Sequence, residues 1–526
     1  MARQKSENRI VPQGPRKLAV TRGVERRGGG RAVPVKEEEM QLSLSFATAE
    51  NRRCERRTAS VKGVDLSSSV THKVPEAKFH PQRACPAEME EVVNRLATAF
   101  SRVAANDGAG GPDGQSIAYV HAHIHEVLPK LHRSLLDGSY QPGDIRRVWI
   151  PKVGGKGQRG LGIPNVVDRV VQEAVRQVLE PLYEPTFHPS SHGFRPGRGC
   201  QTAVAEARGY LSEGNNVVVD LDLESFFDRV PHQRLLARLG ERVSDKRLLR
   251  VIRQMLKARV VLPDGVKVAT EEGVPQGGPL SPLLSNVVLN ELDWELSRRG
   301  HRFVRYADDC NIYVGSERAG MRVMASVVEF IERKLRLQVN ACKSAVARPE
   351  TRHFLGYRLR LCTDGSTEVL LSERSVSRLN QRLRELTPRP CGRSLRAIIA
   401  GVNVYLRGWL SHFGICTEGI ERDIHTADAH LRRRLRAIVL KHWKRKRTIV
   451  RRLIGLGVRA QTAWRRVYGG RKSLWALSAD PVVHRGLRNA YFDAHGLVPL
   501  KARFSSIWTS IPAPEQLTLS LGPARS

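Results

Sequence analysis

Apolar residues recur at helical spacing in several stretches of the chain, each long enough to form an amphipathic helix. Turn-forming residues such as Asn106-Asp107-Gly108 separate these stretches. The pattern therefore predicts helices in both halves of the chain, with three in succession towards the C-terminus. The stretches are 89–100, 124–131, 166–182, 283–292 and three stripes within 371–450.

Other segments carry short β-prone runs and predict strands. Residues 145–152 and 161–164 would form a hairpin around a glycine-rich loop. Residues 303–314 would form a second hairpin, with Asp308 and Asp309 near its tip. The chain is thus expected to be a mixed α/β protein.

The segment 217–223 alternates between apolar and acidic residues. In a strand, this alternation places Asp220 and Asp222 on one face and Val219 and Leu221 on the other. Burying an unpaired carboxylate costs several kcal/mol, so an acid at the end of a buried strand needs a partner.

The composition narrows the class of protein. The chain has 526 residues, which predicts two to four domains. Its 87 Lys and Arg against 52 Asp and Glu give a formal charge of +35. Such an excess points to a polyanionic partner, and nucleic acid is favoured over membrane because no apolar run reaches about eighteen residues.

The N-terminus and the cysteines indicate the compartment. No apolar segment follows Met1-Ala2-Arg3, so a secretory signal is not expected. The eight cysteines are scattered, and none form the closely spaced pairs of a zinc site or a disulfide framework. We expect reduced thiols in a cytoplasmic protein. Residues 1–78 are expected to be a basic, disordered extension that could contact RNA.

The paired acids allow two interpretations. Alone, Asp308-Asp309 is best explained as a solvent-facing acidic turn, since such turns are common. If the strand ending at Asp222 lies beside this hairpin, however, three carboxylates could hold two Mg²⁺ ions about 3.5–4 Å apart.

Basic residues gather in two further loops. Lys152 and Arg159 lie near the tip of the first predicted hairpin, where they could bind a triphosphate or simply face solvent. Arg195 and Arg198 flank a Gly/Pro loop with Phe194, which suits backbone-phosphate contact and base stacking.

These motifs together resemble a known family. Tyr306-Ala307-Asp308-Asp309 looks like the catalytic box of reverse transcriptases. More narrowly, the chain resembles the reverse transcriptase–maturases encoded by bacterial group II introns, over roughly residues 85–500. The order of motifs that carries this resemblance is Arg147…Ile150-Pro151-Lys152, Leu161-Gly162-Ile163-Pro164, His192-Gly193-Phe194-Arg195-Pro196-Gly197, Asp222…Phe227, Pro275-Gln276-Gly277, Tyr306-Ala307-Asp308-Asp309, Lys343 and Phe354-Leu355-Gly356-Tyr357.

The resemblance implies a right-hand polymerase fold. Fingers and a palm with an antiparallel sheet would be followed by an α-helical thumb, also called the maturase domain. The expected boundaries are 1–78 for the extension, 79–216 for the fingers, 217–368 for the palm with the catalytic acids, 369–478 for the thumb, and 479–526 for a short segment that could bind DNA. No His-Asn-His arrangement or cysteine follows residue 480, so the compact type without an endonuclease is expected.

The resemblance also implies roles for individual residues. Asp222, Asp308 and Asp309 would coordinate two Mg²⁺ ions together with the backbone carbonyl of Leu223, and Asp220 ranks second. The nucleotide would contact Lys152, Arg159, Phe227, Gln276 and Lys343. RNA or primer would contact Arg195, Arg198, Gly356, Tyr357, Arg432, Arg433, Arg434 and Arg436. Gly160 departs from the family, which usually has a bulkier residue or proline there.

The last four arginines belong to a run of unusual charge. Leu431–Leu453 holds eleven Lys and Arg and no acid, so it would repel itself without a counter-polyanion. Four aromatic residues interleave with or follow these cations, and they could either stack on bases or pack in the core. They are Trp443, Trp464, Tyr468 and Trp475.

The function implied by the resemblance is RNA-directed DNA synthesis, coupled to intron RNA binding for splicing and to copying of the intron during its mobility (retrohoming). Implied partners are group II intron RNA, an RNA template with a DNA primer, target DNA and dNTPs. A homodimer is compatible with it, and a membrane is not expected. A splicing-only maturase with a vestigial polymerase site is one alternative, which the intact acids disfavour. A domesticated enzyme with a host role in defence or repair is another.

Overall fold

The computed structural model describes residues 87–151, 157–388, 392–470, 472–500 and 504. The predicted extension 1–78 and Lys152 lie outside the described residues. Every described residue belongs to one structural unit, 63–526.

The predicted N-terminal helices form, with one difference. The apolar stretch 89–100 gives two helices, which meet at Arg95, and α4 was not predicted. The helices of this part are α2 Met89–Asn94, α3 Leu96–Ala105, α4 Ile117–Ala122, α5 Ile124–Leu136 and α6 Val166–Tyr183. The middle of α6 is buried because α3, α2 and α11 (Ser281–Arg298) pack around it.

The first predicted hairpin is confirmed. β1 (Ile145–Pro151) pairs antiparallel with β2 (Gln158–Ile163). Two short strands, β4 (Val260–Val261) and β5 (Lys267–Val268), extend this sheet in the order β2-β1-β4-β5. A two-residue strand has no alternation to detect, so β4 and β5 carry no sequence signal.

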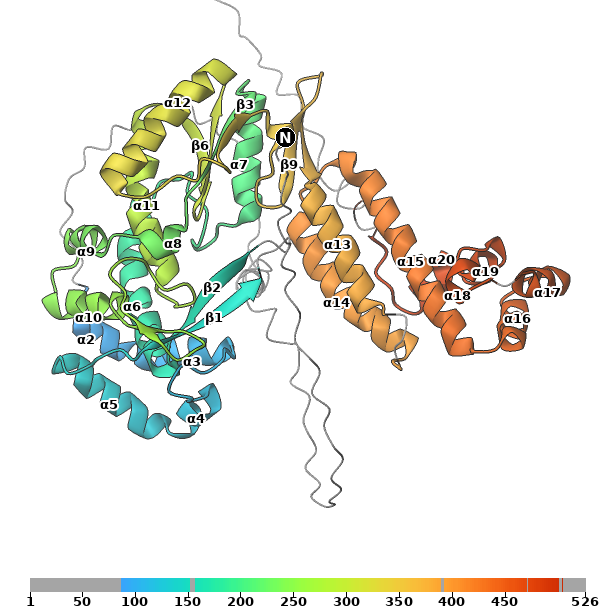
Figure 1. The fold of residues 1–526 in the computed structure, drawn as a ribbon, viewed down its shortest axis with the longest axis horizontal. Coiled ribbons are helices and arrows are strands. Elements are labelled where there is room, and N and C mark those ends of the chain that lie inside the picture. The colour runs from blue at the N-terminus through green and yellow to red at the C-terminus, as the bar shows by residue number, and fades with distance from the viewer. Residues whose placement is uncertain (1–86, 152–156, 389–391, 471, 501–503, 505–526) are drawn as a thin grey trace, which may run out of the picture. The chain divides into compact units, whose positions relative to one another are not determined.

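The strands that carry the acids lie in a second, antiparallel sheet with the order β6-β7-β3-β8. Its members are β3 Val217–Asp222, β6 Arg302–Tyr306, β7 Asp309–Val314 and β8 Ala345–Ala347. Val219 and Leu221 face the core under α11 and α12 (Glu317–Phe330), whereas Val218 faces the second core, with α7 (Cys200–Ser212). Figure 1 shows α11 and α12 on one side of this sheet and α7 on the other.

Shorter helices connect these parts. They are α8 Phe226–Arg229, α9 His232–Gly240 and α10 Lys246–Leu256, with 3-10 and π turns at Glu184–Thr186, Ile331–Leu335, Pro349–Thr351 and Glu418–Ile420. Phe226 is buried in the first core.

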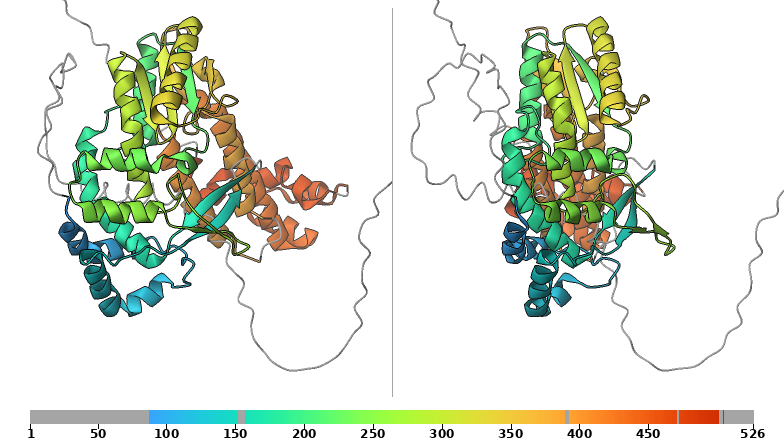
Figure 2. Two further views of the ribbon diagram at one scale, coloured as in Figure 1. Left: turned by 60° about the vertical axis from the view of Figure 1, so that its left-hand side comes forward. Right: turned by 90° about the vertical axis from the view of Figure 1, so that its left-hand side faces the viewer.

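The three C-terminal helices expected within 371–450 are confirmed as α13 Glu373–Leu386, α14 Leu395–Phe413 and α15 Glu421–Trp443. They follow a hairpin of β9 (Tyr357–Leu361) and β10 (Thr367–Leu371). The mixed α/β fold with an antiparallel sheet and a helical C-terminal region is therefore confirmed (Figure 2).

Within the described residues, the helices α16 to α20 follow, which periodicity did not predict. They are α16 Lys446–Gly455, α17 Ala460–Tyr468, α18 Leu474–Leu477, α19 Pro481–Gly486 and α20 Asn489–Ala494. Phe492, Leu500 and Phe504 are buried in the same hydrophobic core as α14 and α15. The boundary predicted at residue 478 thus falls inside a shared core.

Candidate active site

Three carboxylates meet where β3 ends beside the β6–β7 turn. The antiparallel register sets Asp222 directly opposite Asp309. Asp308 lies in the turn itself, after Ala307, whose φ of 58° is unusual for a residue with a side chain. The structure therefore brings Asp222 beside the two acids that the sequence places on another element.

The electrostatics of this cluster disfavour three bare charges. Burial, opposed in part by the Arg159 charge, raises the pKa of Asp308. Burial and repulsion from Asp308 raise the pKa of Asp309 to about 7, although more than a third of the Asp309 surface is open to solvent. That open surface moderates the shift, but its direction follows from three acids sharing one site.

A lysine from a third element reaches the same acids. Lys343 Nζ lies 3.0 Å from Asp222 Oδ2. The loop that carries Lys343 is tied to β3, because Asn340 N–H donates to the Asp222 carbonyl and Ser344 Oγ accepts from Asp222 N–H.

Asp220, which the resemblance ranks second, has a different partner. Its Oδ2 accepts two hydrogen bonds from Arg352, at 2.8 and 2.6 Å. Arg352 also donates to the Lys343 carbonyl at 2.6 Å, so this guanidinium connects the Asp220 side chain with the lysine loop.

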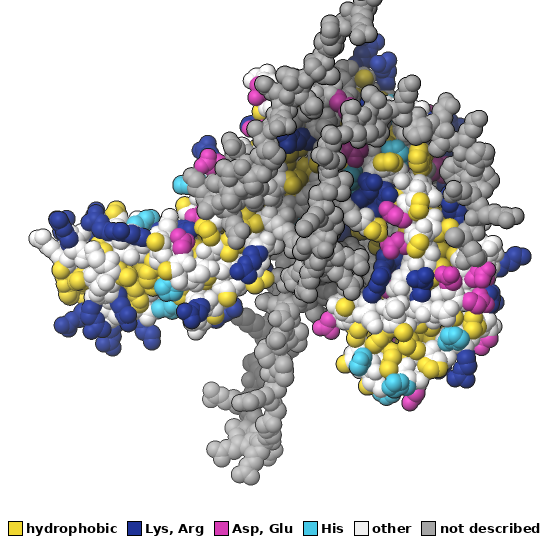
Figure 3. Space-filling view, turned by 180° about the vertical axis from the view of Figure 1, so that it is seen from behind, with side chains coloured by type: hydrophobic (Ala, Val, Ile, Leu, Met, Phe, Trp, Pro, Cys, Tyr) yellow, Lys and Arg dark blue, Asp and Glu magenta, His cyan; other side chains and the backbone are white. Residues whose placement is uncertain are grey.

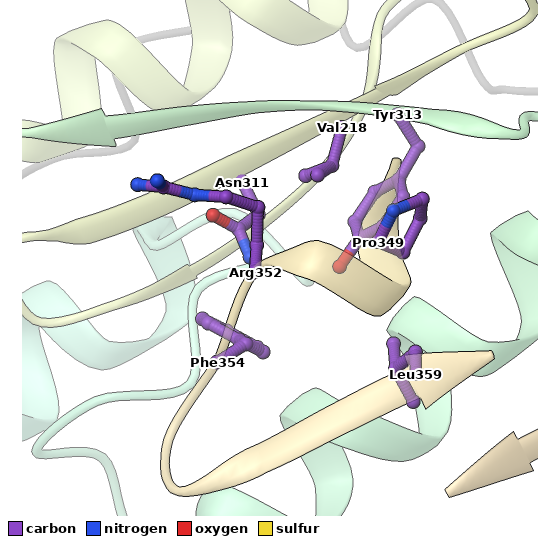
Figure 4. Close-up of a pocket in the computed structure, with 7 residues that line it drawn as sticks. All are labelled: Val218, Asn311, Tyr313, Pro349, Arg352, Phe354 and Leu359. Atoms are coloured by element: carbon purple, nitrogen blue, oxygen red, sulfur yellow. The ribbon is translucent and has the colours of Figure 1, made fainter. Parts of the chain in front are cut away.

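Arg352 and Asn311 also line a small cavity on this face of the sheet (Figure 4). Its volume of about 10 Å³ is enough for one water molecule at most. It is too small for a substrate and belongs to the packing behind the acids.

The predicted nucleotide-binding residues converge from three loops. Gly162 N–H, on the strand that carries Arg159, donates to the Gln276 carbonyl at 2.7 Å, and Val274 N–H donates to the Phe227 carbonyl at 2.6 Å. A Cβ on Gly277, whose φ is 125°, would collide with the Gly162 carbonyl. The loop that contains Gln276 and Gly277 thus holds Arg159, Phe227 and Gln276 in one region. The Phe227 side chain is partly exposed there.

The glycine that departs from the family pattern has a local explanation. Arg147 Nη1 donates to the Gly160 carbonyl at 3.0 Å, and a Cβ on Gly160 would collide with that guanidinium. Gly160 therefore leaves room for the Arg147 side chain across the β1–β2 pair.

Comparison with known proteins agrees with this arrangement. Residues 150–359 match the family described as reverse transcriptase (RNA-dependent DNA polymerase). Residues 376–454 match the maturase-specific domain of group II introns. The chain belongs to the group II intron reverse transcriptase and maturase family. The first match spans all three acids, and the second spans α13 to α15.

Individual relatives match over part of their length. Protein YkfC of Escherichia coli is 37% identical over 36% of this chain and 50% of its own length. The group II intron-encoded protein LtrA of Lactococcus lactis is 31% identical over 46% of this chain and 51% of its own length. The chain thus spans about half the length of these curated relatives.

The acids fit a divalent metal by their chemistry. Carboxylate oxygens are the ligands that Mg²⁺ prefers. Burial raises the pKa of Asp308 and, together with the neighbouring acids, that of Asp309, so a bound cation would stabilise their ionised forms. Among the described residues, no three acidic, His or Cys side chains form a ready-made metal site. The salt bridge with Lys343 occupies one Asp222 oxygen.

Two residues that are predicted to contact RNA or primer have side chains that are bonded inside the protein. Arg195 is buried, and its guanidinium bonds Glu184 at 2.9 Å and the carbonyls of His188 and Ser191. Tyr357 is also buried, and its hydroxyl donates to the His412 carbonyl. The predicted roles of Arg198, which is partly exposed, and of the Gly356 backbone stay predictions.

Two of the four arginines that are predicted to contact RNA on α15 are also buried. Arg432 and Arg436 are each 5% exposed and face the protein interior. Arg432 bonds Asp428 at 2.7 Å and Asp493 at 3.0 Å. Arg436 donates to the Leu487 carbonyl at 3.1 Å. The two residues therefore hold α19 and α20 against α15, and their role as RNA contacts stays a prediction.

Arg433 and Arg434, the other two arginines that are predicted to contact RNA on α15, are partly exposed. Arg434 Nε donates to Thr387 Oγ1 at 2.6 Å, which joins α15 to the end of α13. The Arg433 guanidinium lies 4.2 Å from the centre of the Trp475 ring. Contacts of Arg433 and Arg434 with RNA stay predictions.

The exposed cations lie further along the chain. Lys444, Lys446, Arg447 and Arg451 are exposed on and before α16. Figure 3 shows Lys and Arg side chains gathered over the part of the molecule formed by the last helices. Trp464 and Tyr468, stacked 5.1 Å apart on α17, are 45% and 46% exposed beside them.

Sequence reasoning missed the residues that hold the catalytic turn. Arg305 and Asp293 are both buried and form an ion pair of 2.6 Å directly behind Ala307. Arg305 stands in an apolar run, which is a weak signal for a buried charge because most arginines are exposed.

No helix in the described part of the chain is both long and apolar enough to cross a membrane.

Proposed function

We propose that this protein is an RNA-directed DNA polymerase that uses two Mg²⁺ ions. The observation that carries the proposal is the pairing of Asp222 with Asp309 across β3 and β7, with Asp308 in the adjoining turn. Three acids in one place, with a raised pKa at two of them, are typical of a site that holds divalent cations.

Asp222, Asp308 and Asp309 would hold the ions, with the Leu223 carbonyl as a further ligand. Bound Mg²⁺ would supply electrostatic stabilisation of the attacking and leaving oxygens of phosphoryl transfer. Arg159 and Lys343 carry the positive charge that the site offers to a nucleotide triphosphate, because one acts on Asp308 and the other bonds Asp222. Lys152 stays a predicted contact of the same kind.

The remaining nucleotide contacts would select the substrate. The partly exposed Phe227 ring follows Asp222 by one short turn, where it could press against the sugar and exclude a 2′-hydroxyl. Gln276 would contact the incoming nucleotide. The backbone hydrogen bonds that tie its loop to β2 and to the Phe227 turn support this role.

We further propose that the helical region binds group II intron RNA, assists its splicing, and allows the polymerase to copy it during retrohoming into target DNA. The match of residues 376–454 to the maturase-specific domain supports this assignment. So does the exposed positive charge around α16, which suits a phosphate backbone.

The test is primer extension on an RNA template by the Asp308→Asn, Asp309→Asn double variant. DNA synthesis should be abolished, whereas intron RNA binding should stay close to that of the unchanged protein. Glu317→Gln is a matched control, because Glu317 is an exposed acid at the start of α12. Continued synthesis by the double variant would refute the site.

A further inference from the structure

One guanidinium behind the catalytic turn is fully buried and fully bonded. The Arg305 side chain is 1% exposed, and its partner Asp293 is 0% exposed. Nε and Nη2 of Arg305 each donate to an Asp293 oxygen at 2.6 Å. A buried charge is tolerated only when it is paired and hydrogen-bonded, so Arg305 and Asp293 each require the other.

The other donors of Arg305 reach three different elements. Nη2 donates to Ser191 Oγ at 2.7 Å, and Nη1 donates to Asn286 Oδ1 at 3.1 Å and to the Ala307 carbonyl at 2.8 Å. A guanidinium has five N–H groups, and Arg305 makes five hydrogen bonds. The guanidinium therefore joins α11, the loop before α7 and the catalytic turn.

The turn that receives the last of these bonds needs support. Ala307 has a φ of 58°, in the left-handed region that residues with a side chain rarely adopt. Asn286 Nδ2 donates to the Gly193 carbonyl at 2.9 Å, and a Cβ on Gly193 would collide with the Ala307 backbone nitrogen. The same Asn286 thus fixes both the guanidinium and the backbone that packs on the turn.

We propose that Arg305 is a positioning residue for the polymerase reaction. Held by Asp293, Asn286 and Ser191, it fixes the Ala307 carbonyl and thereby sets the direction of the Asp308 and Asp309 side chains. This inference rests on the proposed function, because it assigns Arg305 a role through the two acids. Lysine cannot replace arginine here, since an ammonium has three donors and lacks the planar fork that bonds both Asp293 oxygens.

The experiment compares Arg305→Lys and Ser191→Ala with Glu291→Gln. Ser191→Ala removes one acceptor from the guanidinium and leaves the ion pair in place, so it should fold even if Arg305→Lys does not. Glu291→Gln is the matched control, because Glu291 lies on the same helix and pairs with Arg238 at 2.6 Å, away from the turn. Each protein is bound to a primer–template and measured for single-nucleotide addition, thermal unfolding and Mn²⁺ binding by electron paramagnetic resonance.

Arg305→Lys should lower kcat on the order of 10²-fold, the usual cost of a misplaced catalytic group. Its KM for dNTP should stay nearly unchanged and its Mn²⁺ binding should weaken severalfold. Ser191→Ala should also lower kcat and weaken Mn²⁺ binding, by smaller factors than Arg305→Lys. Its unfolding temperature should fall too little to account for these losses. Glu291→Gln should match the unchanged protein.

The inference is overturned if kcat and Mn²⁺ binding per folded molecule are unchanged in Ser191→Ala and in any Arg305→Lys that folds. A purely structural ion pair would give that result, because only the folded fraction would fall. If Asp308→Asn, Asp309→Asn abolishes synthesis while these variants do not alter it, the proposed function stands and only the role of Arg305 fails.

Discussion

Lys343 and Asp222 form a salt bridge at the candidate active site, with 3.0 Å between Nζ and Oδ2. The lysine side chain is 63% exposed, whereas the aspartate is 28% exposed. A cation that arrives at Asp222 must therefore compete with this ammonium.

Removing the ammonium should strengthen Mn²⁺ binding to the nucleotide-free protein. An exposed ion pair contributes about 0.2–1 kcal/mol, so Lys343→Gln should tighten binding by no more than about fivefold. The same variant should slow nucleotide addition, because Lys343 is expected to face the departing pyrophosphate. Titration by electron paramagnetic resonance measures the first effect, with Lys334→Gln, an exposed lysine on the π turn after α12, as control. Weaker Mn²⁺ binding in Lys343→Gln would contradict competition.

The two acids of β3 should differ sharply when each is replaced. Asp222→Asn should abolish primer extension, because this carboxylate faces Asp309. Asp220→Asn should keep most of the activity and lower the free energy of unfolding by about 1–2 kcal/mol, because Asp220 bonds Arg352. Primer extension and urea unfolding on both variants check this. Equal loss of activity in the two would show that Asp220 is also a ligand.

Gly193 should not tolerate a side chain. In Gly193→Ala the new Cβ would collide with the Ala307 backbone, which cannot move aside as a flexible side chain could. We expect synthesis to fall by at least about 10²-fold through displacement of the turn. Gly209→Ala is the control, because Gly209 lies in α7 with open space around it and should gain about 0.5–1 kcal/mol of stability. Similar activity in the two variants would mean that the turn adapts.

The sequence was sufficient to predict the elements that carry the acids. Alternation in 217–223 and the two runs around Asp308 depend on burial of one sheet face, and β3, β6 and β7 form as that pattern requires. The pairing of β3 with β7 was predicted only as a condition, because periodicity does not specify which strands are neighbours.

The sequence could not predict which arginines are buried. Arg432 pairs with Asp428, which precedes the run, and with Asp493, which lies sixty-one residues away. Arg305 pairs with Asp293 on another element. A run of cations looks unbalanced when its acids are distant in the chain. Helices α16 to α20 were missed because they are short and contribute only scattered apolar residues to the core that they share with α15.

The hydrogen-bonded pair of His192 and Glu206 near the catalytic turn makes the stability of the folded protein depend on pH. Glu206 accepts hydrogen bonds from His192, at 2.6 Å, and from Ser190 and Tyr210. Although burial opposes them, these bonds lower the pKa of Glu206 below its usual 4.5. The folded state therefore favours the ionised form, and its stabilisation is present above pH 4.5 and lost as the pH falls through the folded pKa.

Glu206→Gln should accordingly lower the free energy of unfolding by about 1.5–3 kcal/mol at pH 7, the value of hydrogen bonds to a charged group. The difference from the unchanged protein should shrink as the pH falls below 4.5. Urea unfolding at several pH values measures it, and a difference that stays constant with pH would show that the ionised form has no special stabilisation.

The basic run of the helical region should separate into structural and RNA-binding residues. Arg432 and Arg436 are buried, so replacing both by Met should lower stability, by about 3–5 kcal/mol if Asp428 is left buried without a partner. Arg447 and Arg451 are exposed, so replacing both by Ala should change stability little. Intron RNA binding by this second variant should weaken, and the slope of its salt dependence should decrease by about one for each phosphate that the protein no longer neutralises.

The two variants control for each other, because each removes two arginines from the same run. Net charge falls equally in both, so a general electrostatic effect would weaken RNA binding to the same extent. Filter binding at several salt concentrations, corrected for the folded fraction by thermal unfolding, separates the cases. An unchanged salt dependence in Arg447→Ala, Arg451→Ala would place the RNA-binding residues elsewhere on the helical region, with Arg433 beside Trp475 as the next position to test, since its guanidinium is partly exposed.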